Sequence, residues 1–409
     1  MKALNFLSLF ALAMLLQACP PTKTTDTNSK STTAEDKKDK GPRRGGGGFE
    51  AMVEKAINQD YKGVNTTSGK EEGLFPLKST GVSTKPIVDA GNNFIETLSE
   101  EEKKSVLFKI DDKEWRHWAN VDNGMFKRTG ISLKVMSQKQ RVALFNLLQE
   151  ALSAKGLQLT KDIMKTDQTL KELNNNSETL DEELYFITIM GTPSMKEPWG
   201  FQFEGHHLAI NYFILGDQVV MTPTFMGGEP IITTSGKYKG NTIFQDEQNI
   251  GLKFMQSLSE AQQKKAILST EKGREDMVAA AFSDNVTVDF EGLKVSEMSS
   301  EQKEAILNLA SQYINNMREG HAKVKMEDIK KHIDATYFAW RGTTADDAVF
   351  YYRIHSPVIL IEFDHQSPVG VRGADRSPTR NHIHTMVRTP NGNDYGKDYI
   401  KQHLNDHKH

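Results

Sequence analysis

The chain has 409 residues, a length that favours two or three domains. Its 51 Lys and Arg residues and 54 Asp and Glu residues give a formal net charge of −3, which argues against nucleic-acid binding through a globally basic surface. The single cysteine excludes an internal disulfide framework and any cysteine-rich zinc or iron–sulfur site.

Residues 1–19 are typical of an export signal. Lys2 precedes an apolar run, Ala3 to Leu16, that is too short to span a bilayer as a mature helix. The only cysteine, Cys19, ends a segment that resembles the bacterial lipobox, in which the cysteine is acylated and becomes the mature N-terminus. We therefore expect an exported protein that is lipid-anchored through Cys19 in the bacterial cell envelope, at the outer membrane or on its periplasmic face. The alternative is a plain signal peptide whose cysteine is incidental.

Residues 20–48 consist mainly of Pro, Thr, Ser, Lys, Asp and Gly and end in two arginines and four glycines. They carry no apolar periodicity, so nothing offsets the entropy of ordering them. This composition predicts a disordered tether between the membrane and a folded body. Residues 49–89 are expected to form an irregular lead-in.

The rest of the chain contains internal similarity. Residues 98–107 resemble residues 258–267, and each segment places a serine before a polar first helical turn. Residues 136–147 resemble 298–309 with helical apolar spacing. The similarity predicts two units, residues 90–230 and 248–396, followed by a polar tail at residues 397–409.

Each predicted unit has helices first and strands afterwards. The first unit is expected to form strands near 184–190, 200–215 and 218–226, and the second near 336–341, 349–364 and 381–389. The predicted fold class is therefore α+β: a tandem duplication of a unit with helices followed by a three-stranded antiparallel sheet, with the two units related by a pseudo-twofold axis.

His382 and His384 are the first candidates for a metal site. Residues i and i+2 of a strand point to the same face, so the two imidazoles can converge on one ion. The alternative is a pair of exposed or hydrogen-bonded histidines on a sheet face.

The segment Glu204-Gly205-His206-His207 supplies further candidates. Because His206 and His207 are adjacent, only one of them can face a given site on a regular strand, unless Gly205 permits a bulge. Our hypothesis is that Glu204 and one of these histidines complete the site of His382 and His384. One divalent transition metal would suit such ligands, and the residue types leave Zn, Cu, Fe and Mn as alternatives. The competing interpretation is a strand-edge pair of histidines that bond backbone carbonyls.

Charged residues on the later strands could support this site. Glu362 lies in an otherwise apolar run, where a buried carboxylate needs partners, and is interpreted as orienting the histidines. Arg353 and Arg388 are either its partners or ligands for a small anionic molecule. For an enzyme we assign Glu204 or Glu362 as the base, with Arg388 as a third catalytic candidate and Arg353 as a binding residue.

Several segments together resemble the domain-of-unknown-function family 3500. They are Trp199 to Leu208, Tyr352 to Pro357, Leu360 to Asp364, Asn381 to Thr385 with Arg388, Asp394 to Gly396, Trp115 to Trp118, and Arg128 to Gly130. The resemblance covers roughly residues 90–403. It implies a family of secreted bacterial proteins, with some fungal members, and no assigned activity. It marks the following residues as positions of the family pattern: Glu204, His206, His207, Arg353, Glu362, His382, His384 and Arg388.

We therefore expect an envelope lipoprotein with a histidine–carboxylate site in which a metal ion activates water or oxygen. Two alternatives stay open: a non-catalytic module that binds a metal or an anion, and a structural or interaction lipoprotein whose histidines only satisfy hydrogen bonds. The sequence does not indicate an oligomeric state.

Overall fold

The computed structural model describes residues 46–371 and 373–406. The predicted signal peptide, Cys19 and residues 20–45 of the predicted tether lie outside the described residues. Among the described residues, no helix has the length and hydropathy needed to cross a membrane.

The helices are α1 (Gly46–Ile57), α2 (Lys85–Ile95), α3 (Glu100–Val106), α4 (Gln138–Ala151), α5 (Ala154–Leu173), α6 (Gln245–Ser257), α7 (Glu260–Ala266), α8 (Ser300–Ile314), α9 (Glu319–Lys331) and α10 (Lys397–Asp406). Short 3₁₀ turns are η1 (Lys113–Arg116), η2 (Val295–Glu297), η3 (Ile333–Ala335) and η4 (Asp394–Gly396). The strands are β1 (Leu107–Phe108), β2 (Ile131–Ser132), β3 (Phe186–Met190), β4 (Trp199–Gly205), β5 (Leu208–Leu215), β6 (Gln218–Val220), β7 (Thr224–Gly228), β8 (Ile267–Ser269), β9 (Leu293–Lys294), β10 (Tyr337–Gly342), β11 (Phe350–Ser356), β12 (Ile359–His365) and β13 (Ile383–Arg388).

Two segments are more regular than the sequence predicted. The lead-in at residues 49–89 contains most of α1 and the start of α2, and most of the predicted polar tail is the helix α10. In helix α10 the buried Ile400 and the partly buried Tyr399 join an apolar cluster with Trp115 and Tyr395, whereas Leu404 is exposed. The first turn of this helix is therefore the part that packs on the body.

Four of the described helices begin with a serine capping box. In α3, α4, α7 and α8 the cap side chain accepts a hydrogen bond from the backbone of the third helical residue, whose own side chain accepts one from the cap backbone. The pairs are Ser99 with Glu102, Ser137 with Gln140, Ser259 with Gln262, and Ser299 with Gln302. Each box satisfies two backbone donors that a helix start otherwise leaves open.

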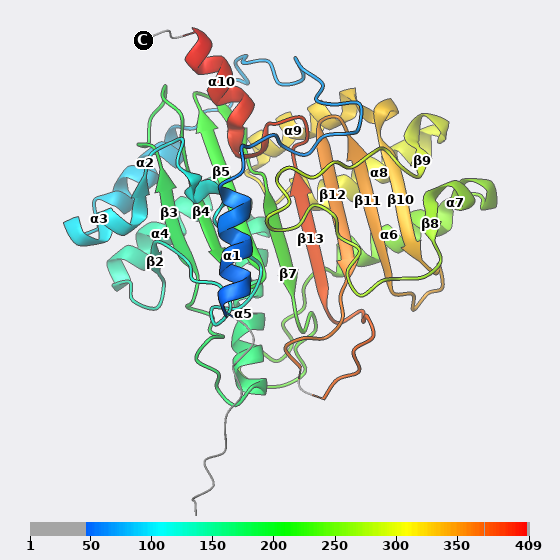
Figure 1. The fold of residues 1–409 in the computed structure, drawn as a ribbon, viewed down its shortest axis with the longest axis horizontal. Helices are drawn as coiled ribbons and strands as arrows, with labels where there is room; N and C mark the ends of the chain where they lie inside the picture. The colour runs from blue at the N-terminus through cyan, green and yellow to red at the C-terminus, as the bar shows by residue number, and fades with distance from the viewer. Residues whose placement is uncertain (1–45, 372, 407–409) are drawn as a thin grey trace, which may run out of the picture. The chain divides into compact units, whose positions relative to one another are not determined.

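The described strands form one sheet, with the order β1-β3-β4-β5-β7-β13-β12-β11-β10-β8 (Figure 1). The expected three-stranded antiparallel units are not confirmed, because the strands merge into a single mixed sheet of 13 strands with parallel pairs near both edges. Read from the edges inward, one half runs β1-β3-β4-β5-β7 and the other β8-β10-β11-β12-β13. The two halves join at the antiparallel pair β7–β13, which we call the seam.

The predicted strands at 200–215 and 349–364 are each two strands joined by a tight turn. His206 and His207 form the turn between β4 and β5, and Pro357 and Val358 form the turn between β11 and β12. Strand-forming residues lie on both sides of each turn and concealed the break: β4 alternates apolar and polar residues, while β5, β11 and β12 are rich in aromatic and β-branched residues. This difference places both adjacent histidines at the end of the sheet.

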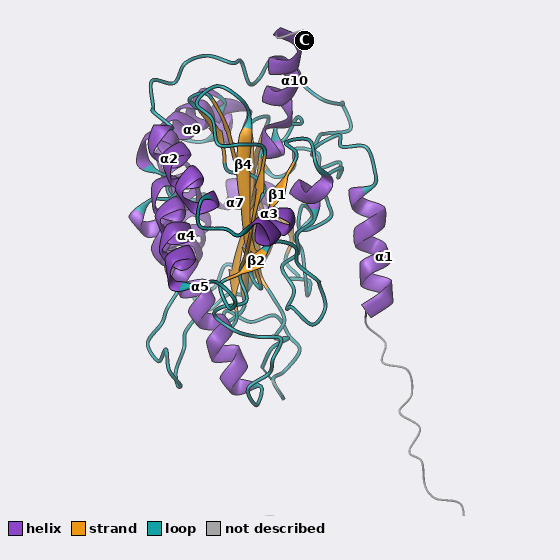
Figure 2. Ribbon diagram, turned by 90° about the vertical axis from the view of Figure 1, so that its left-hand side faces the viewer, coloured by secondary structure: helices purple, strands orange, loops and turns teal. Residues whose placement is uncertain are grey.

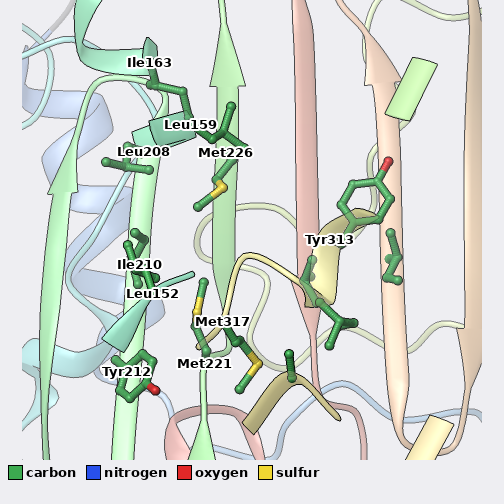
Figure 3. Packing of buried hydrophobic residues seen from close by; sticks show 14 of the residues in the cluster. Leu152, Leu159, Ile163, Leu208, Ile210, Tyr212, Met221, Met226, Tyr313 and Met317 are labelled. Carbon is green, nitrogen blue, oxygen red and sulfur yellow. The ribbon is translucent and has the colours of Figure 1, made fainter. Parts of the chain in front are cut away.

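The two faces of the sheet have different coverings (Figure 2). One face packs beneath helices that include α2, α4, α5 and α9. This face carries rows of mainly apolar side chains, and one row of paired residues across the strands reads Ile354, Ile361, Val387, Thr224, Ile210 and Phe203. Leu208 and Ile210 lie there with Leu152, Leu159 and Ile163 of the helical layer (Figure 3). Burying one such side chain stabilises the fold by about 1.5–3 kcal/mol.

The opposite face, which we call the loop face, carries polar side chains beneath loops. One row of paired residues across it reads Arg353, Glu362, Met386, Phe225, Ala209 and Glu204. All of these side chains are buried. The alternation of apolar and polar residues from Phe201 to Glu204 in β4 therefore separates a helix-covered face from a loop-covered face.

Candidate metal centre

Three histidine rings converge at the end of the seam. His384 lies in β13, His382 directly precedes that strand, and His207 ends the β4–β5 turn. The Nε2 atom of His382 lies 3.2 Å from Nε2 of His207 and 3.0 Å from Nε2 of His384. Only 3%, 2% and 7% of His207, His382 and His384 is exposed. The three rings thus point their Nε2 atoms at one buried place.

Gly227 of β7 positions two of these histidines. It pairs with His384 across the seam, and its N–H donates to the carbonyl oxygen of His207 at 2.8 Å. A Cβ atom at Gly227 would lie 3.0 Å from Cδ2 of the His384 ring and 2.9 Å from the Ile383 carbonyl oxygen. A glycine is therefore required for the His384 ring to occupy this position.

The backbone around His382 selects its tautomer. Its Nδ1 lies 2.8 Å from the carbonyl oxygen of Ser367, which can only accept a hydrogen bond. Nδ1 therefore carries the proton, and the Nε2 lone pair faces the other two rings. The buried carboxylate of Glu229, 3.6 Å from the same Nδ1, accepts hydrogen bonds from the N–H groups of Val369 and Gly370 and so holds the covering loop.

Burial keeps these imidazoles neutral. It lowers the pKa of His207 and His384 well below the ordinary value of 6.5, and the neighbouring histidines lower both further. Burial also lowers the pKa of His382, against the opposing effect of Glu229. A neutral imidazole is the form that binds a metal ion.

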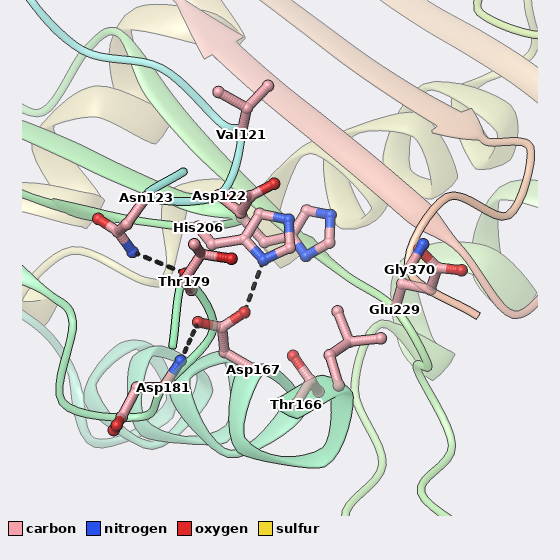
Figure 4. Close-up of polar contacts among 12 residues, drawn as sticks. Val121, Asp122, Asn123, Thr166, Asp167, Thr179, Asp181, His206, Glu229 and Gly370 are labelled. Carbon is pink, nitrogen blue, oxygen red and sulfur yellow. Dashed lines mark hydrogen bonds and ion pairs between the residues drawn. The ribbon is translucent and has the colours of Figure 1, made fainter. Parts of the chain in front are cut away.

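His206 has a different contact from its neighbour. Its ring stacks on His207 with 3.9 Å between ring centroids, while its Nδ1 lies 2.6 Å from Oδ1 of Asp167 on α5 (Figure 4). Asp167 is 1% exposed, and its other oxygen accepts a hydrogen bond from the Asp181 N–H. The left-handed backbone at His207, with φ of 60°, turns the two rings to different partners. The structure thus places His207, and not His206, with His382 and His384.

The donor spacing suits a small divalent ion. Zn–N bonds of about 2.0–2.1 Å in a tetrahedral site put the ligand nitrogens about 3.3 Å apart. The two measured Nε2 separations, 3.2 and 3.0 Å, lie close to that value. The ligand atoms of these three histidines all lie within 4.8 Å of one another. Among the described residues, no other group of three or more His, Cys, Asp or Glu side chains meets this criterion.

Glu204 is not part of that group. Its Oε2 accepts hydrogen bonds from Nε of Arg128 at 3.2 Å and from the Ala119 N–H at 3.4 Å. Burial raises the pKa of Glu204 to about 7, although Arg128 opposes the shift. Arg128 also donates to the carbonyl oxygens of Ala119 and Val121, so the Glu204–Arg128 pair ties a loop to β4.

Glu362 also holds a loop. Its carboxylate accepts from the Tyr351 hydroxyl at 2.7 Å and from the N–H groups of Val278 and Ala279 at 2.8 and 2.9 Å. These contacts satisfy both oxygens in the residue's own buried setting. Like Glu204, Glu362 lies outside the three-histidine group.

The two arginines that sequence reasoning assigned to catalysis or anion binding have protein partners. Arg388 donates to Asp284 at 2.8 Å, to Asp394 at 3.0 Å, and to the carbonyl oxygens of Ala279 and Ala280. Arg353 donates through Nη2 to Glu291 at 2.6 Å.

The sequence did not point to three residues that shape the centre, which are Asp167, Gly227 and Glu229. It also did not identify Arg128 as the partner of Glu204. The first three lie outside the histidine motifs, and no spacing connects them to these motifs along the chain. Arg128 belonged to a segment of the family resemblance, but its partner could not be read from that segment.

Comparison with known proteins agrees with this pattern of residues. The family model described as a protein of unknown function (DUF3500) matches residues 80–397. The chain belongs to this family. The resemblance expected from the sequence is thereby confirmed, and the matched residues contain the three converging histidines together with Asp167 and Gly227. No curated protein and no solved structure matches the chain.

Proposed function

We propose that the protein is a metal-dependent enzyme in which one divalent transition ion, bound by His207, His382 and His384, activates a water molecule. The observation that carries this proposal is the convergence of three buried Nε2 atoms at spacings close to those of a tetrahedral ion.

Three neutral ligands would leave the full charge of the ion available to the fourth position. A zinc ion held by three histidines in this way lowers the pKa of its bound water to about 7. Within the described residues no carboxylate belongs to the ligand group, so none would neutralise the ion or close the fourth position.

His206 is the residue to which we assign proton transfer. Asp167 accepts a hydrogen bond from the Nδ1–H group of His206, so the lone pair on Nε2 is free to act as the base. The His206 ring also stacks on the ring of the proposed ligand His207. The earlier candidates Glu204 and Glu362 fit this role less well, because their oxygens already accept hydrogen bonds from Arg128, Tyr351 and backbone groups.

Elemental analysis of the full chain, purified without a polyhistidine tag, tests the binding step. We expect about one transition-metal ion per chain after dialysis against micromolar zinc, and removal of that ion by a strong chelator. Hydrolysis of chromogenic esters and phosphate esters then tests catalysis. The His206→Gln variant should retain the ion and lose about 100-fold or more in kcat. A protein that takes up no divalent ion at micromolar concentration contradicts the proposal.

A non-catalytic metal-binding role is the second candidate. The observation in its favour is the low exposure of the three rings, at most 7%, which restricts the approach of a substrate. Stoichiometric metal without any metal-dependent turnover would support this alternative.

We also propose that the protein is a lipid-anchored envelope protein, on the evidence of its sequence. Cys19→Ala should remove the acylation site and move the protein from the membrane fraction to the soluble periplasmic or secreted fraction. Fractionation with immunoblotting measures this shift. Retention of the mutant in the membrane through an uncleaved apolar segment would contradict it.

Finally, we infer that the body arose by tandem duplication around a pseudo-twofold axis. What supports this inference is the corresponding strand order of the two halves and the matching capping boxes at α3 and α4 and at α7 and α8. Only one half carries histidines in the turn that corresponds to Pro357 and Val358. In this interpretation the duplicated scaffold acquired one asymmetric site.

A further inference from the structure

A cavity lies on the helix-covered face of the sheet. The histidines lie on the opposite face, the loop face. The cavity has a volume of about 240 Å³ and extends between strands β7 and β13 and helices α8 and α9. Met226 and Thr385 line it, whereas their chain neighbours Gly227 and His384 belong to the metal centre on the loop face. The cavity is thus a second, separate place in the molecule.

Much of the cavity wall is apolar and adaptable. Met221, Met226 and Met317 line it (Figure 3), and so do Ile314 and Val324. Methionine side chains are flexible and polarisable, so they adjust to the shape of a bound group. Since a cavity of about 150 Å³ admits benzene, this one has room for a substituted ring.

Three polar atoms in the same wall lack a protein partner. Oδ1 of Asn316, Oδ1 of Asn393 and Nε2 of His321 are buried and have no hydrogen-bond partner among the described residues. These residues are 4%, 1% and 3% exposed; Asn316 lies in the turn between α8 and α9, Asn393 in the turn before η4, and His321 in α9. Buried polar atoms are normally satisfied, so their gathering at one cavity indicates a ligand that supplies the missing hydrogen bonds once rotation of these side chains turns the closed-off atoms toward it.

The charges of the wall favour a neutral occupant. Its lysines Lys78, Lys325 and Lys331 balance its acids Glu247, Glu327 and Asp328. Burial lowers the pKa of His321 to about 4, with a further contribution from Arg318, so this ring is neutral at pH 7.

We propose that the cavity is a binding site for a small neutral molecule with an apolar ring and at least two hydroxyl groups. The two asparagine oxygens can only accept, so the ligand must donate to them, and His321 gives or takes a third hydrogen bond. The ring occupies the methionine-lined part. The site is a second function of the fold and does not depend on the presence of a metal ion.

Ligand-observed NMR with two probes of similar size, resorcinol and toluene, tests this proposal on the full chain. We expect resorcinol to bind with a Kd of about 1 mM or lower and at least about tenfold more tightly than toluene. Asn316→Leu should remove most of this preference, because the variant keeps the apolar wall and loses one acceptor. Absence of binding by either probe would overturn the proposal in favour of a water-filled space, and equal binding would reduce the site to an apolar void.

Filling the cavity provides the location test. Met317→Trp and, should that variant fold poorly, Val324→Trp should abolish resorcinol binding while leaving metal content unchanged. Val142→Trp is the matched control, because Val142 lies on α4 with 51% of its surface exposed and does not line the cavity. Resorcinol binding that survives in folded cavity-filling variants would place the probe elsewhere and contradict the proposal.

Discussion

Replacing His382 and His384 together by alanine is expected to reduce bound metal from about one ion per chain to below about 0.1. Even residues that only orient a metal ligand change affinity by about 10- to 100-fold, and this variant removes two of the three ligands themselves. The remaining His207 offers a single nitrogen, which cannot hold an ion against dialysis. Elemental analysis and zinc titration with a competing dye measure the loss.

The fold of this double variant must be checked separately, because both histidines are buried. Exposed histidines on a sheet face, the alternative considered from the sequence, are not what the structure shows, because only 2% of His382 and 7% of His384 is exposed. We expect the apoprotein of the wild type and the variant to unfold within a few degrees of each other, and metal to stabilise the wild type alone. At a free metal concentration of 1,000 times Kd that stabilisation is about 4.1 kcal/mol. The control variant replaces two other histidines by alanine: His332, the C-cap residue of α9, and His403 in α10. This control should keep its full metal content. Equal metal in all three proteins would contradict the proposed ligands.

Arg388→Met should destabilise the protein by about 3–5 kcal/mol, because it leaves buried carboxylates without their cation. Arg388 is fully buried and donates to both Asp284 and Asp394, and Asp284 also bonds Arg116 and the Tyr395 hydroxyl. Methionine is close to arginine in length, so the loss of charge dominates over the loss of packing. Denaturant unfolding measured with and without the substitution gives the difference.

The pH dependence distinguishes this charge effect from a packing defect. Burial raises the pKa of Asp284, but Arg388 and Arg116 outweigh it and leave the pKa below the ordinary value of 3.8. The charged Asp284 therefore contributes stability above about pH 4 that is lost as the pH falls through its lower native pKa. We expect the deficit of the variant to be largest at neutral pH and to shrink as the pH falls below about 4, through the native pKa of Asp284. The control Arg141→Met breaks a half-exposed pair with Glu183 and should cost at most about 1 kcal/mol. A deficit that does not vary with pH would assign the effect to packing.

Much of the local structure could be predicted from the chain itself. Ser99, Ser137, Ser259 and Ser299 mark helix starts because a capping box needs only residues that are near in sequence. The hairpin turns were missed because His206 and Pro357 interrupt apolar strands without the usual glycine–asparagine chemistry. The merging of two sheets at β7–β13 depends on pairing between distant segments, which no local pattern encodes.

The candidate site was predictable in part for the same reason. The shared face of His382 and His384 follows from strand periodicity, although His382 precedes the strand itself. The choice between His206 and His207 depends on the left-handed backbone at His207 and on Asp167, 39 residues before His206 in the chain. The surroundings of Glu204 and Glu362 could not be read from the sequence, because a buried carboxylate looks alike there whether it faces an ion or an arginine and backbone amides.

The three rings come from both halves of the sheet, and this has a consequence for the unfolded chain. His207 and His382 are 175 residues apart in sequence but touch across the seam. An ion shared by them would act as a reversible cross-link that closes a loop of that length. In the chain-entropy model, closing such a loop in the unfolded chain would cost about 5 kcal/mol, so the ion would bind the folded chain far more tightly than the unfolded one. The ion would then hold the two halves together much as a disulfide does, in a chain whose only cysteine lies at position 19.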